Sequence, residues 1–418
     1  MRMLEIARAI TSGGAGDTSC AYDPAMRIGI VGGGIGGFSA ALSLARSGHD
    51  ISVFERAASL SEVGAGVQIS PNAWRVLHWL GLGDEFADIA VLPTSVVLRR
   101  WEDDSVIRTN DLDAEIMATW GLPLASVART DLIELLGAAV SAVSNISVHY
   151  RRRVADVEPL PDHSTVVFDD GSTASFDVVV GADGIHSVVR EAVGCVDAAR
   201  FSGSVAYRAL VPRDRVEDLP VETTNRVGPD SHVVSYFIGR HRSHLNLVCI
   251  SPEDTWTTES WTEPGTLDDL RARFANWSPQ LQAILDRVDE PVFRWALYDR
   301  EPTAQWGVGT TTLLGDACHP MLPFMAQGSC QAIEDAAVLG RCLADVDAAS
   351  GAAALRRYES ARQARTAQIQ TTSFGNRDLF HMPDGQMQRD RDEFLGSGIG
   401  GLSMLDWVYS YDPVTAPI

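Results

Sequence analysis

The chain has 418 residues, 45% of them hydrophobic, and its 34 Lys and Arg against 55 Asp and Glu give a formal net charge of −21. This hydrophobic content excludes an intrinsically disordered protein. The acidic balance argues against nucleic acid as a partner, because that binding requires clustered positive charge. No stretch approaches the roughly 20 consecutive apolar residues that span a bilayer, so we expect no membrane span.

The first 25 residues lack the apolar core of a signal peptide, and we expect them to form a flexible N-terminal extension (1–25). Met26, directly before the first predicted strand, is a second candidate for the start of the protein. The six cysteines are scattered along the chain without a C-x-x-C pair. This pattern is typical of reduced thiols, and we expect a cytoplasmic location.

A strand, a glycine-rich turn, a helix and a second strand are predicted between residues 27 and 55. In the turn, Gly32 permits a sharp bend, Gly34 lets the backbone approach a pyrophosphate and Gly37 lets the helix pack closely on the strand. Glu55 ends the second strand, where a carboxylate can accept hydrogen bonds from ribose hydroxyls. The pattern predicts a dinucleotide-binding βαβ unit.

Strand-like segments dominate the middle of the chain, with a hairpin signal at residues 169–171, and helical segments begin at about residue 320. This order predicts an α/β fold in which one domain is interrupted by another. The expected parts are a nucleotide-binding domain at 26–90, 126–199 and 301–345, strands of a substrate domain at 91–125, a β-sheet substrate domain at 200–300, and a helical C-terminal region at 346–418.

Two later strand–turn–helix motifs are suited to bring the backbone close to a bound nucleotide. In the first, an apolar strand leads into Asp183 and Gly184. In the second, a strand leads into Gly315 and Asp316, whose carboxylate can hold a ribityl or ribose hydroxyl. The helix that residues 323–329 open has a positive N-terminus, which favours the negative charge of a reduced flavin ring in front of it.

Taken together, these motifs resemble those of the single-component FAD-dependent aromatic hydroxylases, also called group A flavoprotein monooxygenases. The resemblance is greatest to the branch of salicylate hydroxylase and 6-hydroxynicotinate 3-monooxygenase, and it extends from about Arg27 to Asp412. Further matching segments are 64–72, 129–132, 298–300, 358–365, 381–385 and 406–409. The resemblance implies a p-hydroxybenzoate hydroxylase-like fold: a Rossmann-like FAD-binding domain interrupted by a β-sheet substrate domain, with a helical C-terminal part.

The resemblance implies FAD as cofactor and NADH or NADPH as co-substrate. Glu55 is expected to bind the adenosine ribose, Arg129 the diphosphate and Asp316 the ribityl chain. Many relatives have His at the position of Ala128, a departure that affects one polar contact but not the cofactor. The expected cofactor contacts are Gly32, Gly34, Gly37, Glu55, Arg56, Gly66, Val67, Arg129, Asp183, Gly184, Gly315, Asp316, Pro323, Gln327 and Gly328.

In this family NAD(P)H reduces the flavin, O2 adds to give a C4a-hydroperoxide, and its distal oxygen is transferred to a phenolic ring carbon. The chemistry is the cofactor's, so the protein must orient the substrate, draw off its phenolic proton and exclude water. Tyr207 is our first candidate for the group that takes the proton, and His232, Tyr236 and His319 are the alternatives. Gln68 is expected to face the substrate or the flavin edge.

A carboxylated substrate must enter against the field of a strongly acidic molecule, so a local arginine has to compensate, and Arg208 is the candidate. Pro323 and Met325 are expected to form apolar walls beside the flavin, although they are equally suited to the protein core. The expected substrate-binding residues are thus Tyr207, Arg208, Tyr236, Pro323 and Met325, and the expected catalytic residues are Tyr207, His319 and Gln68.

We predict hydroxylation of a small phenolic or hydroxypyridine carboxylate. Loss of the carboxylate, as in salicylate hydroxylase or 6-hydroxynicotinate 3-monooxygenase, is left open. The alternatives are ring hydroxylation without decarboxylation, as in 3-hydroxybenzoate 6-hydroxylase, and a flavin reductase or sensor that inserts no oxygen. No metal site is expected, because the ten histidines include no His-x-x-x-His pair. The resemblance also allows a homodimer.

Overall fold

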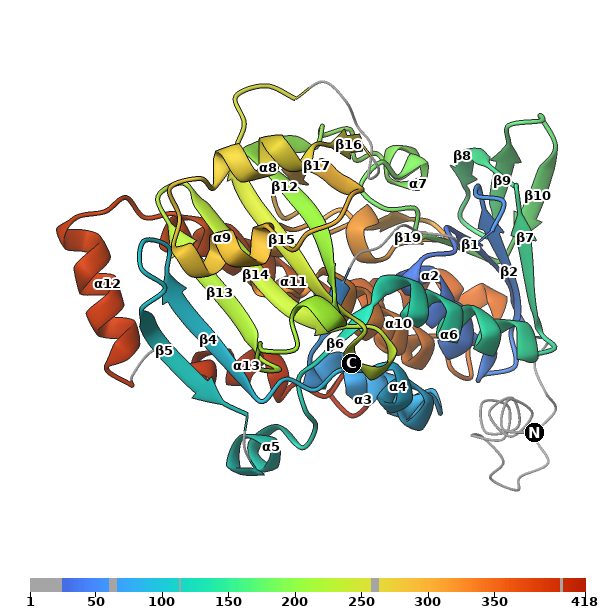
Figure 1. Cartoon of the computed structure of the whole chain (residues 1–418). Helices are drawn as coiled ribbons and strands as arrows, with labels where there is room; N and C mark the ends of the chain where they lie inside the picture. The colour runs from blue at the N-terminus through green and yellow to red at the C-terminus, as the bar shows by residue number, and fades with distance from the viewer. Residues whose placement is uncertain (1–24, 60–65, 113, 257–262, 399–400) are drawn as a thin grey trace.

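A computed structural model describes residues 25–59, 66–112, 114–256, 263–398 and 401–418. Residues 1–24 of the expected extension lie outside the described residues, as do Gly64 and Ala65. Two large sheets, with helices packed against them, make up most of the described chain (Figure 1). Within that part of the chain, no helix is both long and apolar enough to cross a membrane.

The first sheet has six strands in the order β18-β19-β11-β1-β2-β7 and is parallel at its centre. Helices α2, α6 and α10 pack on one face, and the three-stranded sheet β10-β9-β8 packs on the other. Its central strands are continuous apolar runs because both of their faces are buried. The strands are β1 (Arg27–Val31), β2 (Asp50–Glu55), β7 (Ile146–Tyr150), β11 (Val178–Gly181), β18 (Gly307–Val308) and β19 (Thr311–Leu313), and the smaller sheet has β8 (Val154–Pro159), β9 (Ser164–Phe168) and β10 (Thr173–Phe176).

The second sheet has eight strands in the order β16-β17-β12-β15-β14-β13-β4-β5, and all of its pairs are antiparallel except β13 with β4. Figure 1 shows it as a broad layer between α8 and α9 on one side and α11 on the other. Its strands are β4 (Ser95–Arg100), β5 (Val106–Asp111), β12 (Arg200–Pro212), β13 (Thr223–Gly228), β14 (Ser231–Ile238), β15 (His244–Pro252), β16 (Glu263–Gly265) and β17 (Val292–Asp299).

The two faces of this second sheet have different neighbours. Alternate residues of a strand point to opposite faces. Tyr207 belongs to a buried cluster with Leu270 of α8 and Leu281 of α9, on what we call the outer face. Its neighbour Ala206 belongs to another cluster with Leu322 and Phe324, on what we call the inner face. The inner face is therefore the one that meets the turn after the Gly315–Asp316 motif.

A short two-stranded antiparallel sheet, β3 (Gly66–Ile69) with β6 (Ala125–Ala128), connects the two layers. The backbone N–H of Gly66 donates to Oδ1 of Asn246 on β15 at 3.2 Å. The α-helices of the described chain are α2 (Ile35–Ala45), α3 (Pro71–Trp79), α4 (Gly83–Ile89), α5 (Ala114–Trp120), α6 (Arg129–Ala142), α7 (Val188–Ala192), α8 (Leu267–Arg273), α9 (Pro279–Leu285), α10 (Gly328–Cys342), α11 (Gly351–Phe380), α12 (Gln386–Gly396) and α13 (Asp406–Tyr409).

The mixed α/β fold with a helical C-terminal part, expected from the sequence, is confirmed. The predicted hairpin at residues 169–171 is the turn between β9 and β10. We propose that the six-stranded and eight-stranded sheets are the centres of the two expected domains, since their strands come from alternating segments of the chain.

Small residues let α2 and α10 pack closely beside the first sheet. A Cβ added at Gly340 of α10 would lie 2.8 Å from Cβ of Ser43 and 3.1 Å from its backbone carbonyl oxygen. A Cβ added at Gly375 of α11 would meet nothing within 4 Å, and that residue is exposed.

We therefore expect Gly340→Ala to destabilise the protein by about 1–3 kcal/mol, because the added methyl group overpacks the helix contact. The control Gly375→Ala should stabilise it by about 0.5–1 kcal/mol through helix propensity. Denaturant unfolding monitored by far-UV circular dichroism measures both changes. Equal stability of the two variants would contradict this account of the α2–α10 contact.

Candidate functional site

The glycine turn after β1 has the geometry that its spacing predicts. Gly32 has a φ of +104°, and a Cβ there would lie 2.4 Å from the carbonyl oxygen of Ala182. A Cβ at Gly37 would lie 1.9 Å from the carbonyl oxygen of Gly32, so only glycine permits this helix–turn approach. A Cβ at Gly34 would meet nothing within 4 Å, which leaves open space in front of the turn. This is the arrangement that admits a pyrophosphate next to a helix N-terminus.

Glu55 lies at the end of β2, beside this turn. Its carboxylate accepts hydrogen bonds from the backbone N–H groups of Gly33, at 2.8 Å, and Ala57, at 2.7 Å. The side chain is half-buried, whereas that of Arg56 is exposed. Glu55 therefore lies beside the glycine turn, and its contact with a ribose stays a prediction. The cofactor contact expected of Arg56 stays a prediction.

The Gly315–Asp316 motif lies next to the same glycine turn. A Cβ added at Gly36 would lie 2.8 Å from a side-chain atom of Leu314. A Cβ added at Gly328, the first residue of α10, would lie 3.8 Å from Oδ1 of Asp316. Asp316 is thus at the N-terminus of α10, close to the first motif in space although far from it in sequence.

Asp316 is accessible to solvent, and yet burial raises the pKa of its carboxyl group, while the positive charges of His319 and Arg129 oppose that rise. Asp316 thus presents its carboxylate to water at the N-terminus of α10. Arg129, the first residue of α6, is close enough for its charge to act on Asp316. The structure therefore brings these two predicted FAD contacts together.

The Asp183–Gly184 motif closes the other side of the glycine turn, through Ala182. The carboxylate of Asp183 accepts hydrogen bonds from Oγ of Ser187 at 2.6 Å and from the N–H of Val188 at 2.8 Å. These bonds cap the start of α7, and Gly184 has a φ of +81°. A cofactor contact from this motif would therefore come from its backbone, since the Asp183 carboxylate is already used.

A network of buried charges holds these motifs in place, and the sequence analysis assigned it no role. Arg362 of α11, with 0% exposure, donates to Oε2 of Glu334 at 2.6 Å and to Oδ1 of Asp335 at 2.7 Å. Asp335 also accepts the backbone N–H of Gly315 at 3.0 Å. Oε1 of Glu334 accepts Nδ2 of Asn72 at 2.6 Å. The neighbouring charges lower the pKa of Glu334 and hold that of Asp335 at about 2, against the effect of burial.

Gln327, expected as a cofactor contact, belongs to this network. Its side-chain amide donates to Oγ of Ser70 at 2.9 Å and accepts from Nδ2 of Asn72 at 3.1 Å. Its contact with FAD, as those of Gly66 and Val67, stays a prediction. Pro323 is exposed, whereas Met325 belongs to a buried cluster with Trp120, Ile369, Leu402, Val408 and Tyr409, so Met325 has the environment of a core residue.

Arg208 and Tyr236, expected to bind substrate, both lie on the inner face of the eight-stranded sheet. The guanidinium of Arg208 lies 3.6 Å from the ring centroid of Trp295. A Cβ added at Gly66 of β3 would lie 2.6 Å from the ring of Tyr236. Burial raises the pKa of Tyr236 to about 12, and the charge of Arg208 opposes that rise, so the two side chains interact.

Tyr207, our first candidate for proton transfer, lies on the outer face of the sheet. Its ring is fully buried in the cluster with α8 and α9, and its hydroxyl donates to the carboxylate of Asp269 on α8. Burial and this hydrogen bond raise the pKa of Tyr207 to about 12. Its role in proton transfer stays a prediction. Because β12 has apolar residues on both faces, the sequence did not show which face Tyr207 takes.

Two other predicted catalytic residues lie near the motifs but have structural partners. Nε2 of His319 is 2.6 Å from Oδ2 of Asp335, in the buried network. Nε2 of Gln68 on β3 is 3.4 Å from Oγ1 of Thr223 on β13 of the eight-stranded sheet. Their catalytic roles stay predictions.

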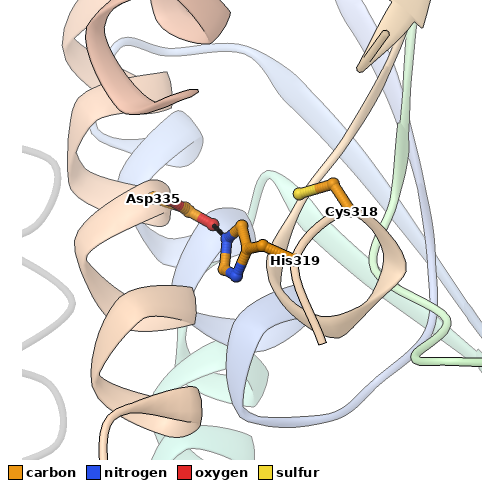
Figure 2. Close-up of side chains that lie close together, drawn as sticks. All are labelled: Cys318, His319 and Asp335. Atoms are coloured by element: carbon orange, nitrogen blue, oxygen red, sulfur yellow. Dashed lines mark hydrogen bonds and ion pairs between the residues drawn. The ribbon is translucent and has the colours of Figure 1, made fainter. Parts of the chain in front are cut away.

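Figure 2 shows Cys318, His319 and Asp335, whose possible metal-ligand atoms lie within 4.8 Å of one another. Burial raises the pKa of the Cys318 thiol well above its ordinary value, and Sγ points to the carbonyl oxygen of Gly315 at 3.4 Å. Metal binding requires a deprotonated thiolate. The carboxylate of Asp335 is also occupied by Gly315, His319 and Arg362. These donors do not fit a metal ion. Their contacts instead join the turn at Gly315 to Asp335 of α10.

One neighbour of the inner face was missed by sequence reasoning. His381, at the end of α11, contacts His232 of β14 across 149 positions of sequence, with 2.7 Å between Nε2 and Nδ1. The only signal was that both residues are histidines in or beside segments already singled out.

The FAD binding domain family matches residues 25–373 of the chain. The chain is 38% identical to 3-amino-4-hydroxybenzoate 2-monooxygenase from Streptomyces platensis, over 94% of the chain and 97% of that protein. It is 33% identical to 6-hydroxynicotinate 3-monooxygenase from Pseudomonas fluorescens, over 84% of the chain and 91% of that protein.

Among solved structures, a salicylate hydroxylase substrate complex superposes with a TM-score of 0.78 at 26% identity, and the match covers 93% of this chain and 96% of that one. The position of the Asp316 motif beside the glycine turn and Glu55 is consistent with an FAD-binding fold of this kind. The chain belongs to the FAD binding domain family and is a flavin-dependent monooxygenase of the aromatic hydroxylase type.

Proposed function

We propose that the protein hydroxylates a small aromatic carboxylate that also carries a ring hydroxyl, using O2 and NADH or NADPH. The observation that carries this proposal is the pair Arg208 and Tyr236 on the inner face of the sheet, opposite β3 of the expected FAD-binding domain. A positive charge and a neutral hydroxyl, next to apolar side chains, suit an anionic ring substrate.

FAD fits the converging motifs. The open space at Gly34 would receive its pyrophosphate, Glu55 its adenosine ribose, and Asp316 with Arg129 the ribityl and diphosphate region. When bound, FAD supplies the redox and oxygen chemistry that side chains lack. The side chains of this protein would bind the cofactor, orient the substrate and shield both from water.

Arg208 would pair with the substrate carboxylate, and its stacking on Trp295 fixes the plane of the guanidinium. Tyr236 stays protonated at neutral pH, because its pKa is about 12, and so it can donate a hydrogen bond to the substrate but cannot act as a base. His232 lies on the same face, and burial lowers its pKa well below the ordinary value. The imidazole is therefore neutral, with one nitrogen able to accept a hydrogen bond, and its position on the inner face makes His232 rather than Tyr207 our candidate for the group that takes the phenolic proton.

The apolar residues Ala206, Ile250, Trp295, Leu297, Leu322 and Phe324 pack together on the inner face and keep water from the adjoining surface. Exclusion of water favours productive hydroxylation. We propose plain ring hydroxylation as well as decarboxylative hydroxylation as candidate reactions. The first is favoured by the similarity to 3-amino-4-hydroxybenzoate 2-monooxygenase and the second by the salicylate hydroxylase neighbour. NADH is the preferred co-substrate of the proposal, and a homodimer stays a prediction.

The function is tested by offering 3-amino-4-hydroxybenzoate, salicylate, 6-hydroxynicotinate, 3-hydroxybenzoate and 4-hydroxybenzoate to the holoenzyme with NADH or NADPH. We expect one of these to stimulate O2-dependent NADH oxidation and to yield a hydroxylated product, and CO2 release separates the two reactions. Absence of a hydroxylated product from every aromatic carboxylate, with FAD bound, would overturn the proposal.

Gly34→Ala should weaken FAD binding without disturbing the apoprotein. The residue has φ −80°, which alanine adopts readily, and the added methyl group has no protein neighbour but would meet the pyrophosphate. We expect an FAD Kd at least about tenfold higher, which is about 1.4 kcal/mol. Flavin absorbance per protein after desalting measures this loss, circular dichroism checks the fold, and Gly375→Ala is the control with wild-type FAD content.

Arg208→Met should raise the KM of a carboxylated substrate about 10- to 100-fold, because a hydrogen bond to a charged group contributes about 1.5–3 kcal/mol. The matched control is Arg294→Met. Arg294 precedes Trp295 on β17 and pairs in register with Tyr207, so it belongs to the outer face. Its guanidinium also lies near an aromatic ring, 5.1 Å from the ring centroid of Trp256. The control should keep the wild-type KM. Similar KM values for both variants would remove Arg208 from the site.

Tyr207→Phe should leave hydroxylation unchanged and cost about 1.5–3 kcal/mol of stability, because it removes a hydrogen bond to the charged carboxylate of Asp269. Tyr236→Phe should lower kcat/KM about three- to tenfold, since it removes a hydrogen bond to the substrate. Steady-state kinetics and thermal unfolding of both variants provide the comparison. A larger activity loss in Tyr207→Phe than in Tyr236→Phe would return the role to Tyr207.

A further inference from the structure

His232 and His381 form a hydrogen-bonded pair of imidazoles at the edge of the inner face. His232, on β14, is 1% exposed, and its ring centroid lies 5.0 Å from that of Phe324 and 5.4 Å from that of Phe380. Nδ1 of His232 is 2.7 Å from Nε2 of His381. The contacts of His232 with Phe324 place it beside the turn that follows the Asp316 motif.

The backbone fixes His381 where α11 ends. Its N–H donates to the carbonyl oxygen of Arg377 at 2.9 Å, and its own carbonyl oxygen accepts the N–H of Asp230 at 3.1 Å. His381 is 9% exposed against 1% for His232, so it is the outer member of the pair. The pair thus leads from the inner face towards solvent.

Both imidazoles are neutral at neutral pH. Burial lowers the pKa of His232 well below its ordinary value and that of His381 to about 4. The charged groups around His381 are Arg377, which lowers its pKa further, and Asp378, which opposes this, both on α11, with Asp230 at the β13–β14 turn. On the His232 side the packed rings are Phe324 and Phe380, which carry no charge.

Two neutral imidazoles joined by one hydrogen bond share a single N–H between them. If Nδ1 of His232 carries that proton, its Nε2 is free to accept another, and Nε2 of His381 is the acceptor within the pair. Within the described part of the chain, Nε2 of His232 has no protein hydrogen-bond partner. This tautomer is oriented to move a proton outward.

We propose that His381 is a positioning residue that makes His232 part of a two-imidazole proton relay from the substrate ring hydroxyl to solvent. The proposal rests on the proposed function. The ring hydroxyl loses its proton to Nε2 of His232, Nδ1 of His232 gives its proton to Nε2 of His381, and Nδ1 of His381 releases a proton to water. Charge balances, since the substrate becomes a phenolate and one proton leaves the protein. The electron-rich ring that results is the form that accepts oxygen. Both imidazoles then carry their proton on the other nitrogen, and the reverse transfer, which returns a proton from water to the hydroxylated product, restores the starting tautomers.

The relay also explains why a buried polar pair is placed at this point of an otherwise apolar cluster. A histidine whose pKa is about 4 does not retain a proton at neutral pH, so His381 returns to its neutral form after each transfer. A single buried histidine at position 232 would have to keep the proton in an apolar environment, which is costly.

The test compares His381→Gln and His381→Ala with wild-type holoenzyme, using a substrate for which the wild type forms a hydroxylated product. Gln can keep a hydrogen bond to His232 but cannot pass a proton on. We expect kcat for hydroxylation to fall about 10- to 100-fold, with KM and FAD content unchanged. The loss should be largest at low pH and shrink as pH rises, because hydroxide then takes the proton instead. Added imidazole should restore part of the activity of His381→Ala.

The control is His163→Gln, which replaces an exposed histidine between β8 and β9 and should behave as wild type. A His381→Gln enzyme with wild-type kcat and pH profile, or a loss that is confined to thermal stability, would falsify the relay. So would a loss in His381→Ala that imidazole does not restore. Failure of the proposed function is a separate result, because it appears as absence of product in the wild type.

Discussion

The buried guanidinium of Arg362 is the interaction on which the cofactor site depends. It joins α11 to two adjacent carboxylates of α10, and these carboxylates hold the backbone N–H of Gly315 and the amide of Asn72. Removing one partner of such a buried pair costs about 3–5 kcal/mol, since the other charge is left without compensation. The turn that presents Asp316 to solvent is therefore held in place by buried groups of α10 and α11.

A purely apolar cluster could stabilise the same helices, often at a lower free-energy cost than a buried ion pair. It could not satisfy the turn, however. Gly315 has a φ of +63°, and its N–H points into the protein, where an acceptor must be present. Asp335 is that acceptor, and Arg362 keeps its carboxylate ionised. The charges are thus required by the backbone geometry of the site rather than by the stability of the helices.

Local patterns predicted the parts of the site that depend on the backbone. The three glycine roles follow from spacing alone, because each depends on a turn of about six residues, and the structure places open space at Gly34 and close contacts at Gly32 and Gly37. The side-chain part of the site depends on which face of a sheet each residue takes. Strand β12 has apolar residues on both faces, since α8 and α9 cover one and the Leu322–Phe324 turn the other, so Tyr207 and Arg208 could not be assigned to faces from the sequence. The His232–His381 contact depends on how α11 crosses the sheet, which no local pattern encodes.

The net charge of −21 and an anionic substrate are compatible once distances are considered. At physiological ionic strength the Debye length is about 8 Å, so most acidic groups on the surface are screened from a ligand within the protein. Arg208 acts at contact distance and in an environment of partly buried aromatic and apolar side chains, where an ion pair is screened much less. The local arginine therefore outweighs the distant carboxylates at the site. The overall negative charge would affect how quickly an anionic substrate arrives, whereas the proposed role of Arg208 is to hold it.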